Sequence, residues 1–262
     1  DDDYFGICPT DLKNKINKDT GAVIVVHIGG LVTKNILKIK KICLQKKIPL
    51  IEDCAQAYAS SYNKHKVGNF GIAGAFSFQT TKVITSGEGG IVTTNNKIFY
   101  KKLLSNRFYG IDFKDPLSFV SEGNNFKMTE LGALSVICDL ERSKKRILKR
   151  QQIAKRYQIN LKNTKWITLK PHKNSETSYY KQIIISPIDR IELTKKMIKK
   201  NISLTGGVYF RPLHRQQIVG IKKDKYYPNA TFFADNHFCP PCYPELTLNE
   251  IDYICNNLKE IA

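Results

Sequence analysis

The chain has 262 residues, of which 42% are hydrophobic, and this is enough for one large domain with a smaller one attached. No apolar run approaches the roughly eighteen residues that a membrane span needs and no cationic, apolar leader opens the chain, so we expect a cytoplasmic protein without a membrane segment. The formal net charge of +19 raises the question of a nucleic-acid partner, but the lysines are spread along the whole chain, and the densest run, residues 142–156, has the period of one helix with a solvated basic face.

The first predicted elements alternate between helix and strand. A short helical pattern at residues 11–18 precedes a continuous apolar run, residues 22–27, that glycines close. Such a run is typical of a buried parallel strand. Residues 35–46 have the apolar periodicity of a helix packed on a sheet, and residues 48–51 form the next strand. A strand, a helix and a strand in this order predict a right-handed parallel crossover in an α/β sheet.

Two chemically capable residues follow predicted strands. Asp53 lies at the carboxyl end of its strand, where ligands gather in open α/β sheets, although it can also be the N-cap of the turn at residues 54–60. Residues 75–78 form the next apolar strand and lead to Lys82, in a loop that ends in the glycine-rich residues 87–90. A neutral lysine amine is a nucleophile toward carbonyls and can hold an aldehyde cofactor. Taken alone, Lys82 can equally be an ordinary exposed lysine.

The middle of the chain is mostly helix and loop. A strand at residues 91–94 and a basic helix at residues 97–106 lead to residues 109–122, which show no period. A loop of this length in a compact domain is often functional. Residues 129–157 are mostly helical, and residues 130–140 are apolar enough to be buried.

The pattern changes after Asn160, so we divide the chain into a large domain, residues 1–160, and a small C-terminal domain, residues 161–262. The small domain reads as an α+β unit that a capped helix closes. Its predicted elements are strands at residues 166–169, 179–185 and 202–210, a helix at residues 191–200, and a last helix at residues 248–261 with Thr247 as its N-cap.

The seven cysteines are an odd number and are scattered through apolar runs. This argues against a disulfide framework and for a reducing compartment. Cys239 and Cys242 have the spacing of a redox or zinc pair, but two prolines separate them and no second pair or histidine cluster accompanies them. We therefore expect no metal site.

Five short motifs are informative as an ordered set: residues 51–57 (IEDCAQA), 76–78 (FSF) with Lys82, 85–90 (TSGEGG), 123–128 (GNNFKM) and 212–214 (PLH). They resemble the DegT/DnrJ/EryC1/StrS family of nucleotide-sugar aminotransferases, in the family's order and over nearly the whole chain. The resemblance implies pyridoxal 5′-phosphate (PLP) as the cofactor. It also implies an α/β fold of fold type I (aspartate aminotransferase-like), with a mostly parallel sheet sandwiched by helices and a smaller α+β C-terminal domain.

The resemblance implies a role for each of four residues. Lys82 would hold the cofactor covalently and, once a substrate amine displaces it, would move the proton between the substrate carbon and the cofactor. Asp53 would keep the pyridine nitrogen protonated through a charge-assisted hydrogen bond. Ser77 would supply a hydroxyl to the cofactor phosphate, and Gln56 would lie against the cofactor ring.

A fifth residue, Asn125, matches the asparagine that in this family reaches the cofactor phosphate of the neighbouring subunit. Outside the family it would be explained as a turn asparagine after Gly123. The resemblance therefore implies a homodimer with shared active sites. Lys82 stands where the related sugar dehydratases carry a histidine, which favours transamination over deoxygenation.

The chain also departs from the family pattern. The family's N-terminal block, with a glycine-threonine phosphate turn and part of the substrate pocket, has no counterpart before the strand at residues 22–26. Together with the unusual start at residues 1–4, this indicates a fragment of a longer enzyme or a truncated product. Lys127, Ile72 and Tyr58 stand where an arginine, an aspartate and a histidine are common, which affects fine positioning more than the chemistry.

We predict PLP-dependent transfer of an amino group, with glutamate as donor, to a nucleotide-linked keto-deoxysugar, for amino-sugar and surface polysaccharide or glycoconjugate biosynthesis. The alternative is a truncated or non-catalytic family member that acts as a structural or regulatory partner, whose signature would be the loss of Lys82 or Asp53. A basic nucleic-acid-binding protein would show clustered lysines with stacking aromatic residues, and the sequence does not.

Overall fold

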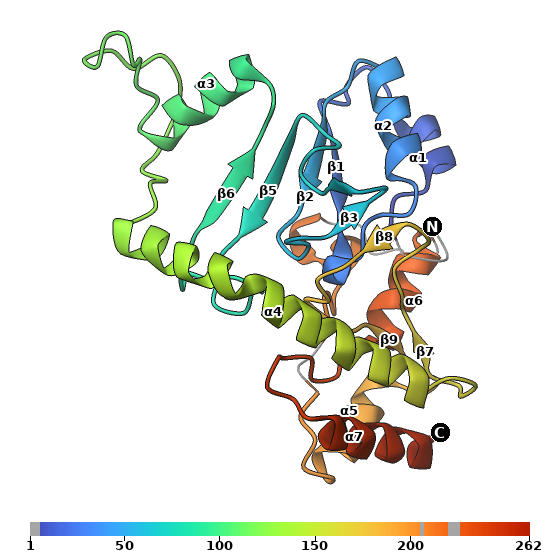
Figure 1. Ribbon diagram of the computed structural model, residues 1–262. Coiled ribbons are helices and arrows are strands. Elements are labelled where there is room, and N and C mark those ends of the chain that lie inside the picture. The colour runs from blue at the N-terminus through green and yellow to red at the C-terminus, as the bar shows by residue number, and fades with distance from the viewer. Residues whose placement is uncertain (1–5, 205–206, 220–225) are drawn as a thin grey trace.

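The computed structural model describes residues 6–204, 207–219 and 226–262, so the unusual start at residues 1–4 lies outside the described residues. The N-terminal half is built on a four-stranded sheet in which β1, β2 and β5 are parallel and β6 is an antiparallel edge (Figure 1). The strands are β1 (Val23–Val26), β2 (Leu50–Asp53), β5 (Ala73–Ser77) and β6 (Gly90–Thr93). The prediction of a mostly parallel α/β sheet is confirmed.

One face of this sheet is covered by α1 (Pro9–Lys15) and α2 (Ile36–Gln45). Alternate residues of a strand point to opposite faces, so Val23 and Val25 pack under α2 while Ile24 is 59% exposed on the other face. Helix α2 is the crossover between β1 and β2, as predicted. Its packing holds the carboxyl ends of the two strands side by side.

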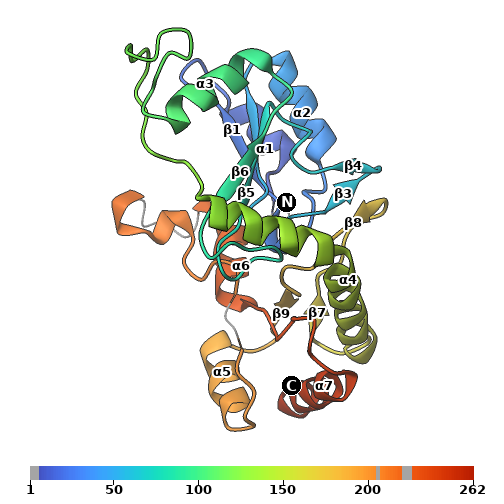
Figure 2. The same cartoon turned by 60° about the vertical axis from the view of Figure 1, so that its left-hand side comes forward.

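A small second sheet and a long loop lie at the border of the main sheet. Strands β3 (Ser61–Tyr62) and β4 (His65–Lys66) form a hairpin that pairs with β8 (Ser175–Glu176). Helix α3 (Lys97–Arg107) follows β6 and leads into a loop that projects from the body (Figures 1 and 2). Residues 109–122 contain neither helix nor regular strand, which confirms the predicted loop.

The long helix α4 (Glu130–Asn160) crosses from the sheet to the C-terminal part of the chain (Figures 1 and 2). The expectation that residues 130–140 are buried is wrong. Within this range only Val136 is buried, and Leu131 is 82% exposed. The helix contacts the sheet half through a single stripe, in which Val136 packs on Phe78, so the apolar residues of its other faces meet solvent in the described chain.

The C-terminal part is a three-stranded antiparallel sheet with helices around it. The last turns of α4 pack in one buried cluster with Leu193 and Ile251, whereas the predicted domain division near Asn160 stays a prediction. The elements are β7 (Ile167–Thr168), β9 (Ile184–Ile185), α5 (Arg190–Ile198), α6 (Pro228–Asn236), β10 (His237–Phe238) and α7 (Leu248–Ile261).

Three predictions for this part can be compared with the structure. Residues 179–185 are strand only at their end, because the residues before β9 cross the turn that follows β1 instead of joining a sheet. The described part of residues 202–210 forms no strand, and residues 205–206 lie outside the described residues. The last helix is confirmed, with Thr247 and Glu250 forming a reciprocal capping box.

Within the described ranges, none of the helices combines the length and the apolar character that a bilayer crossing requires.

His237, the first residue of β10, is fully buried against an aromatic ring. Its imidazole stacks on Phe233 with ring centroids 4.1 Å apart. The Nδ1–H donates to the Phe233 carbonyl, and Nε2 accepts a hydrogen bond of 2.9 Å from the Val208 N–H. The pKa of His237 is lowered to about 4, chiefly by burial and to a smaller extent by the positive charge of Arg190, while the bond to the Phe233 carbonyl opposes both effects.

This histidine makes stability depend on pH. The folded-state pKa of about 4 lies below the ordinary value of 6.5, so between these values the unfolded chain binds a proton that the folded chain does not. The free energy of unfolding should therefore fall by about 3 kcal/mol as the pH is lowered from 6.5 to 4. Urea unfolding of the wild type and of His237→Gln across this range checks it, because the variant should lack this part of the pH dependence; parallel curves would contradict it.

Candidate active site

The carboxyl ends of the parallel strands bring predicted site residues together. Asp53 ends β2 and Ser77 ends β5. Because Asp53 is in register with Ala75 of the neighbouring strand, Ser77 lies only two residues beyond it at the same edge of the sheet. The Asp53 Oδ1 accepts a hydrogen bond of 3.0 Å from the Ala55 N–H, which orients the carboxylate in the turn after β2.

Gln56 joins this turn to the turn after β1, because its Oε1 accepts a hydrogen bond of 2.6 Å from the Gly29 N–H. Gly29 and Gly30 both have positive φ angles, 64° and 98°. A Cβ on Gly29 would lie 2.6 Å from the Ile183 side chain, and one on Gly30 would lie 3.0 Å from the Thr177 hydroxyl. The C-terminal segment therefore packs directly on this edge of the sheet, at a distance that only glycine permits.

Lys82 lies in the loop between β5 and β6, and α4 holds this loop through the backbone of Thr85. The Asp139 Oδ2 accepts a hydrogen bond of 3.1 Å from the Thr85 N–H, and Ser135 donates to the Thr85 carbonyl at 3.2 Å. Asp139 is itself paired with Arg146 at 2.9 Å. Side chains from one helix thus hold both backbone groups of a residue that lies three positions after the lysine.

Two tyrosines, one near Lys82 and one near Asp53, belong to no motif, and the sequence did not single them out. The Tyr180 hydroxyl lies 3.0 Å from the Thr81 hydroxyl, and the Lys82 Nζ lies 4.8 Å from the centroid of the Tyr180 ring. Burial raises the pKa of Tyr209, and the negative charge of Asp53 adds to this effect, so Tyr209 lies within electrostatic reach of that carboxylate. Only long-range packing reveals both residues.

The structure does not bring Asn125 to this edge. Asn125 is exposed, forms an isolated bridge with Phe108 at the end of α3, and donates its own N–H to the Asn124 Oδ1 at 2.8 Å. In this chain it therefore belongs to the long loop before α4.

Glu52, the neighbour of Asp53 in β2, is the centre of a buried hydrogen-bond network. Its Oε1 accepts bonds of 2.6 and 2.8 Å from the N–H groups of Phe70 and Gly71, and its Oε2 accepts one of 2.8 Å from Gly68. The His27 Nε2 lies 3.1 Å from the same Oε2, and the side chains of both residues are fully buried. Burial raises the pKa of Glu52, but the hydrogen bonds from His27, Gly71 and Gly68 outweigh burial and hold the pKa below its ordinary value.

This network also explains a cluster that could otherwise be taken for a metal centre. One donor atom each from His27, Glu52 and Cys54 lies within 4.8 Å of the others. The His27 Nδ1 accepts the Thr33 N–H, so Nε2 carries the proton and donates to Glu52. Burial, followed by the charges of Glu52 and Asp53, raises the pKa of the Cys54 thiol, which therefore stays protonated. His27 and Glu52 are therefore hydrogen-bonded to each other, and the Cys54 thiol is protonated, so the three groups are poorly suited to bind a metal.

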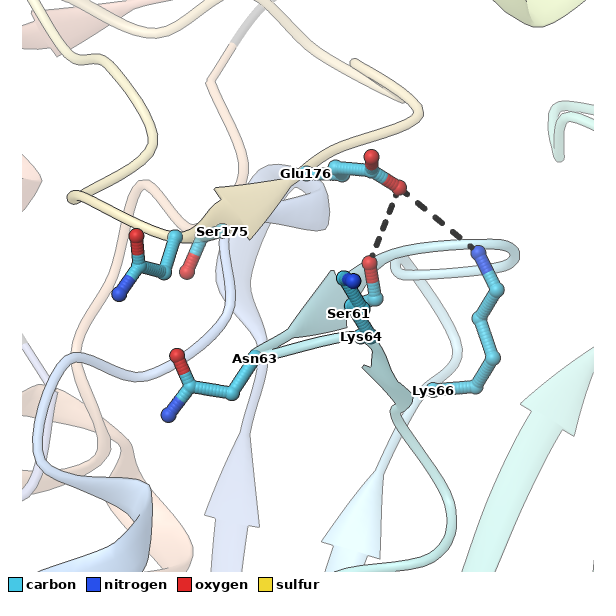
Figure 3. A pocket seen from close by; sticks show the side chains of 7 residues that line it. Ser61, Asn63, Lys64, Lys66, Ser175 and Glu176 are labelled. Carbon is cyan, nitrogen blue, oxygen red and sulfur yellow. Dashed lines mark hydrogen bonds and ion pairs between the residues drawn. The ribbon is translucent and has the colours of Figure 1, made fainter.

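A polar pocket lies away from this edge, between the β3–β4 hairpin and β8 (Figure 3). Glu176 points across it to the Ser61 hydroxyl at 3.1 Å and to the Lys66 ammonium at 4.0 Å. The pocket contains none of the predicted site residues. Its lining is formed by Ser61, Asn63, Lys64, Lys66, Asn174, Ser175 and Glu176.

Cys239 and Cys242 are both buried, and neither forms a disulfide. Burial raises the pKa of Cys239 to about 12 and also raises that of Cys242. A thiolate is the reactive and metal-binding form, so burial disfavours the redox or zinc role that their spacing allows.

The groups at the edge suit PLP. The Ser77 Oγ accepts the Gln79 N–H at 3.3 Å, which leaves its own hydrogen to donate to a phosphate oxygen. Together, Asp53, Ser77 and Lys82 present a carboxylate, a hydroxyl donor and a primary amine. These are the partners that a pyridine nitrogen, a phosphate and an aldehyde need. The residues present therefore fit this cofactor.

Comparison with solved structures identifies the fold. The structure matches DesV of S. venezuelae, solved in complex with a ketimine intermediate, with a TM-score of 0.92 at 21% identity over 100% of this chain and 70% of that chain. At this identity the likeness shows the fold, and the predicted α/β fold is confirmed.

The sequence gives the family. The model of the DegT/DnrJ/EryC1/StrS aminotransferase family matches residues 1–259, and the chain belongs to this family of PLP-dependent sugar aminotransferases. It is 31% identical to a GDP-perosamine synthase of Vibrio cholerae, over 95% of this chain and 68% of that protein. It is 26% identical to the UDP-4-amino-4,6-dideoxy-N-acetyl-beta-L-altrosamine transaminase of Helicobacter pylori, over 94% of this chain and 67% of that protein. The predicted family is confirmed.

Replacement of Glu52 tests the buried network. In Glu52→Gln an NH₂ group replaces one of the two carboxylate oxygens. It then faces either the N–H groups of Phe70 and Gly71 or those of Gly68 and His27, so at least one donor loses its acceptor in the interior. We expect a loss of about 3 kcal/mol in the free energy of unfolding, measured by urea titration. Glu176→Gln, at an exposed carboxylate with a hydroxyl and an ammonium partner, is the matched control and should cost less than about 1 kcal/mol. Equal effects of the two substitutions would contradict this account.

Proposed function

We propose that this protein transfers an amino group from an amino acid, glutamate, to the keto group of a nucleotide-linked deoxysugar, and that the product serves amino-sugar and surface polysaccharide or glycoconjugate synthesis. Relatives named for GDP- and UDP-linked amino sugars support the substrate class. The observation that carries the proposal is the position of Asp53 and the Lys82 loop at one edge of the parallel sheet. The seven cysteines all lie in the described residues and none forms a disulfide, which fits a cytoplasmic reaction.

In this proposal each residue at the edge has one task. Bound PLP supplies the electron sink that makes the substrate carbon acidic. Asp53 accepts the hydrogen bond of the protonated ring nitrogen, and Ser77 donates to the phosphate. Gln56, whose Oε1 accepts the Gly29 N–H, would lie against the ring. The Lys82 amine would bind the cofactor covalently and, once released, would move a proton between the substrate carbon and the cofactor.

Asn125 takes part in this proposal only through a second copy of the chain. Asn125 is exposed in the segment before α4, and apolar residues in the first turns of α4, such as Leu131 and Leu134, are exposed as well. The chain between α3 and α4 projects from the body (Figure 1). An exposed apolar surface of this kind is typical of a protein interface. We therefore propose a homodimer in which Asn125 of the partner subunit donates to the phosphate.

The covalent role of Lys82 can be tested directly. Purified protein incubated with PLP and then reduced with borohydride should carry the cofactor on the peptide that contains Lys82, as read by mass spectrometry. Lys82→Ala should lose this adduct, and Lys127→Ala, which removes another lysine near an aromatic ring, should keep it. A folded wild type without an adduct on Lys82 would refute the role, and addition of glutamate before reduction should prevent the adduct by displacing the lysine.

The shared site can be tested by mixing inactive variants. Lys82→Ala and Asn125→Ala should each retain PLP poorly, but mixed dimers of the two contain one site in which both residues are intact. Unfolding and refolding an equal mixture should therefore restore cofactor retention to about a quarter of the wild-type level. A mixture of Lys82→Ala with Asp53→Asn is the matched control, because both changes fall in the same chain's site, and it should restore nothing. Equal results for the two mixtures would contradict a shared site.

A further inference from the structure

We propose that Tyr180 is a positioning residue that holds Lys82 in place from the C-terminal part of the chain. The inference rests on the proposed covalent role of Lys82, and it concerns a residue that no motif marks. Tyr180 contacts the lysine loop in two ways: through its hydroxyl, which bonds Thr81, and through its ring, which lies under the lysine ammonium.

The direction of the hydroxyl bond follows from the neighbouring bonds. Thr81 Oγ1 donates its single hydrogen to the Gln79 Oε1 at 2.7 Å. The Gln79 amide is oriented by a second bond, in which its Nε2 donates to the Thr80 hydroxyl at 2.8 Å. Tyr180 must therefore be the donor in its bond of 3.0 Å to Thr81. The tyrosine thus completes a hydrogen-bond chain that fixes the residue directly before Lys82.

The ring acts on the lysine itself. The Lys82 Nζ lies 4.8 Å from the Tyr180 ring centroid, within the range of a cation–π interaction, and the Lys181 Nζ lies 5.3 Å from the same ring. Tyr180 is 9% exposed, so its ring is a fixed surface rather than a mobile one. It limits where the lysine amine can move before the cofactor binds.

Tyr180 can hold the lysine because its own backbone is anchored. The Lys181 N–H donates to the Gly29 carbonyl at 3.2 Å, and the Thr177 hydroxyl donates to the Gly30 carbonyl at 2.8 Å. Arg150 of α4 donates to the Tyr180 carbonyl at 3.4 Å and also to the carbonyl of Cys242. The tyrosine is thus fixed both to the turn after β1 and to the long helix that also holds Thr85.

The effect of the ring can be measured without the cofactor. Brief acetylation of the apoprotein, followed by mass spectrometry, compares the reactivity of Lys82 with that of all other lysines in the same sample. Loss of the cation–π contact in Tyr180→Leu should raise the relative reactivity of Lys82 about two- to five-fold, and Tyr180→Phe, which keeps the ring, should leave it near the wild-type value. Tyr253→Leu, which removes a tyrosine of α7 that donates to the Lys200 carbonyl, is the matched control and should not change Lys82.

The effect of the hydroxyl can be measured as the rate at which borohydride-stable PLP appears on Lys82. Tyr180→Phe and Thr81→Val both remove the bond between Tyr180 and Thr81, and Thr81→Val also removes the bond from Thr81 to Gln79. Each should slow this rate about two- to ten-fold, and the double variant should be no slower than Thr81→Val alone. Tyr180→Phe and Thr81→Val are nearly isosteric with the wild type, so the proposal can still be tested if Tyr180→Leu does not fold.

The two proposals fail in different ways. Unchanged Lys82 acetylation in Tyr180→Leu, or additive rate effects of the two hydroxyl variants, would overturn the positioning role of Tyr180. A wild type that forms no adduct on Lys82 would overturn the covalent role of the lysine, whatever the acetylation shows.

Discussion

The buried carboxylate of Glu52 is the constraint on which the rest of the site depends. A carboxylate can be fully buried only where hydrogen-bond donors replace the water it loses, and here three backbone N–H groups and one imidazole do so. Its partners belong to the end of β1 and to the turn before β5, so one side chain joins the ends of two strands to the turn that leads into the third. Asp53, the next residue, is placed by this network although it takes no part in it.

The lysine loop is held from two directions, and both depend on α4. Asp139 and Ser135 hold Thr85 directly, whereas Arg150 holds Tyr180, which in turn contacts Thr81 and Lys82. The helix packs on the sheet half with Val136 and on the C-terminal half with Tyr157. The backbone around the flexible Lys82 side chain is thereby fixed by a helix that packs on both halves of the chain.

Local pattern was enough to predict much of this architecture. The strand–helix–strand unit from β1 to β2, the strand that leads to Lys82, the long loop and the final capped helix all follow from periodicity and turn residues within short windows. Asp53, Ser77 and Lys82 could be named because each follows a strand end or belongs to a motif. The burial of residues 130–140 was predicted wrongly because an apolar sequence shows that a surface should be covered but not whether this chain covers it. Tyr180, Tyr209 and Asp139 could not be predicted, since each reaches the site only through contacts between residues far apart in the sequence.

Gly30 has a consequence for how sequences of this kind can diverge. Its position leaves 3.1 Å between a hypothetical Cβ and the Gln56 carbonyl and 3.4 Å between that Cβ and the Tyr180 nitrogen, so the segment that carries Tyr180 passes almost against bare backbone. An alanine here would move that segment outward and would separate the tyrosine from the lysine without altering either. Gly30 therefore helps to set the distance between Tyr180 and Lys82. Substitutions at Gly30 and at Tyr180 should be interpreted as changes to this one contact.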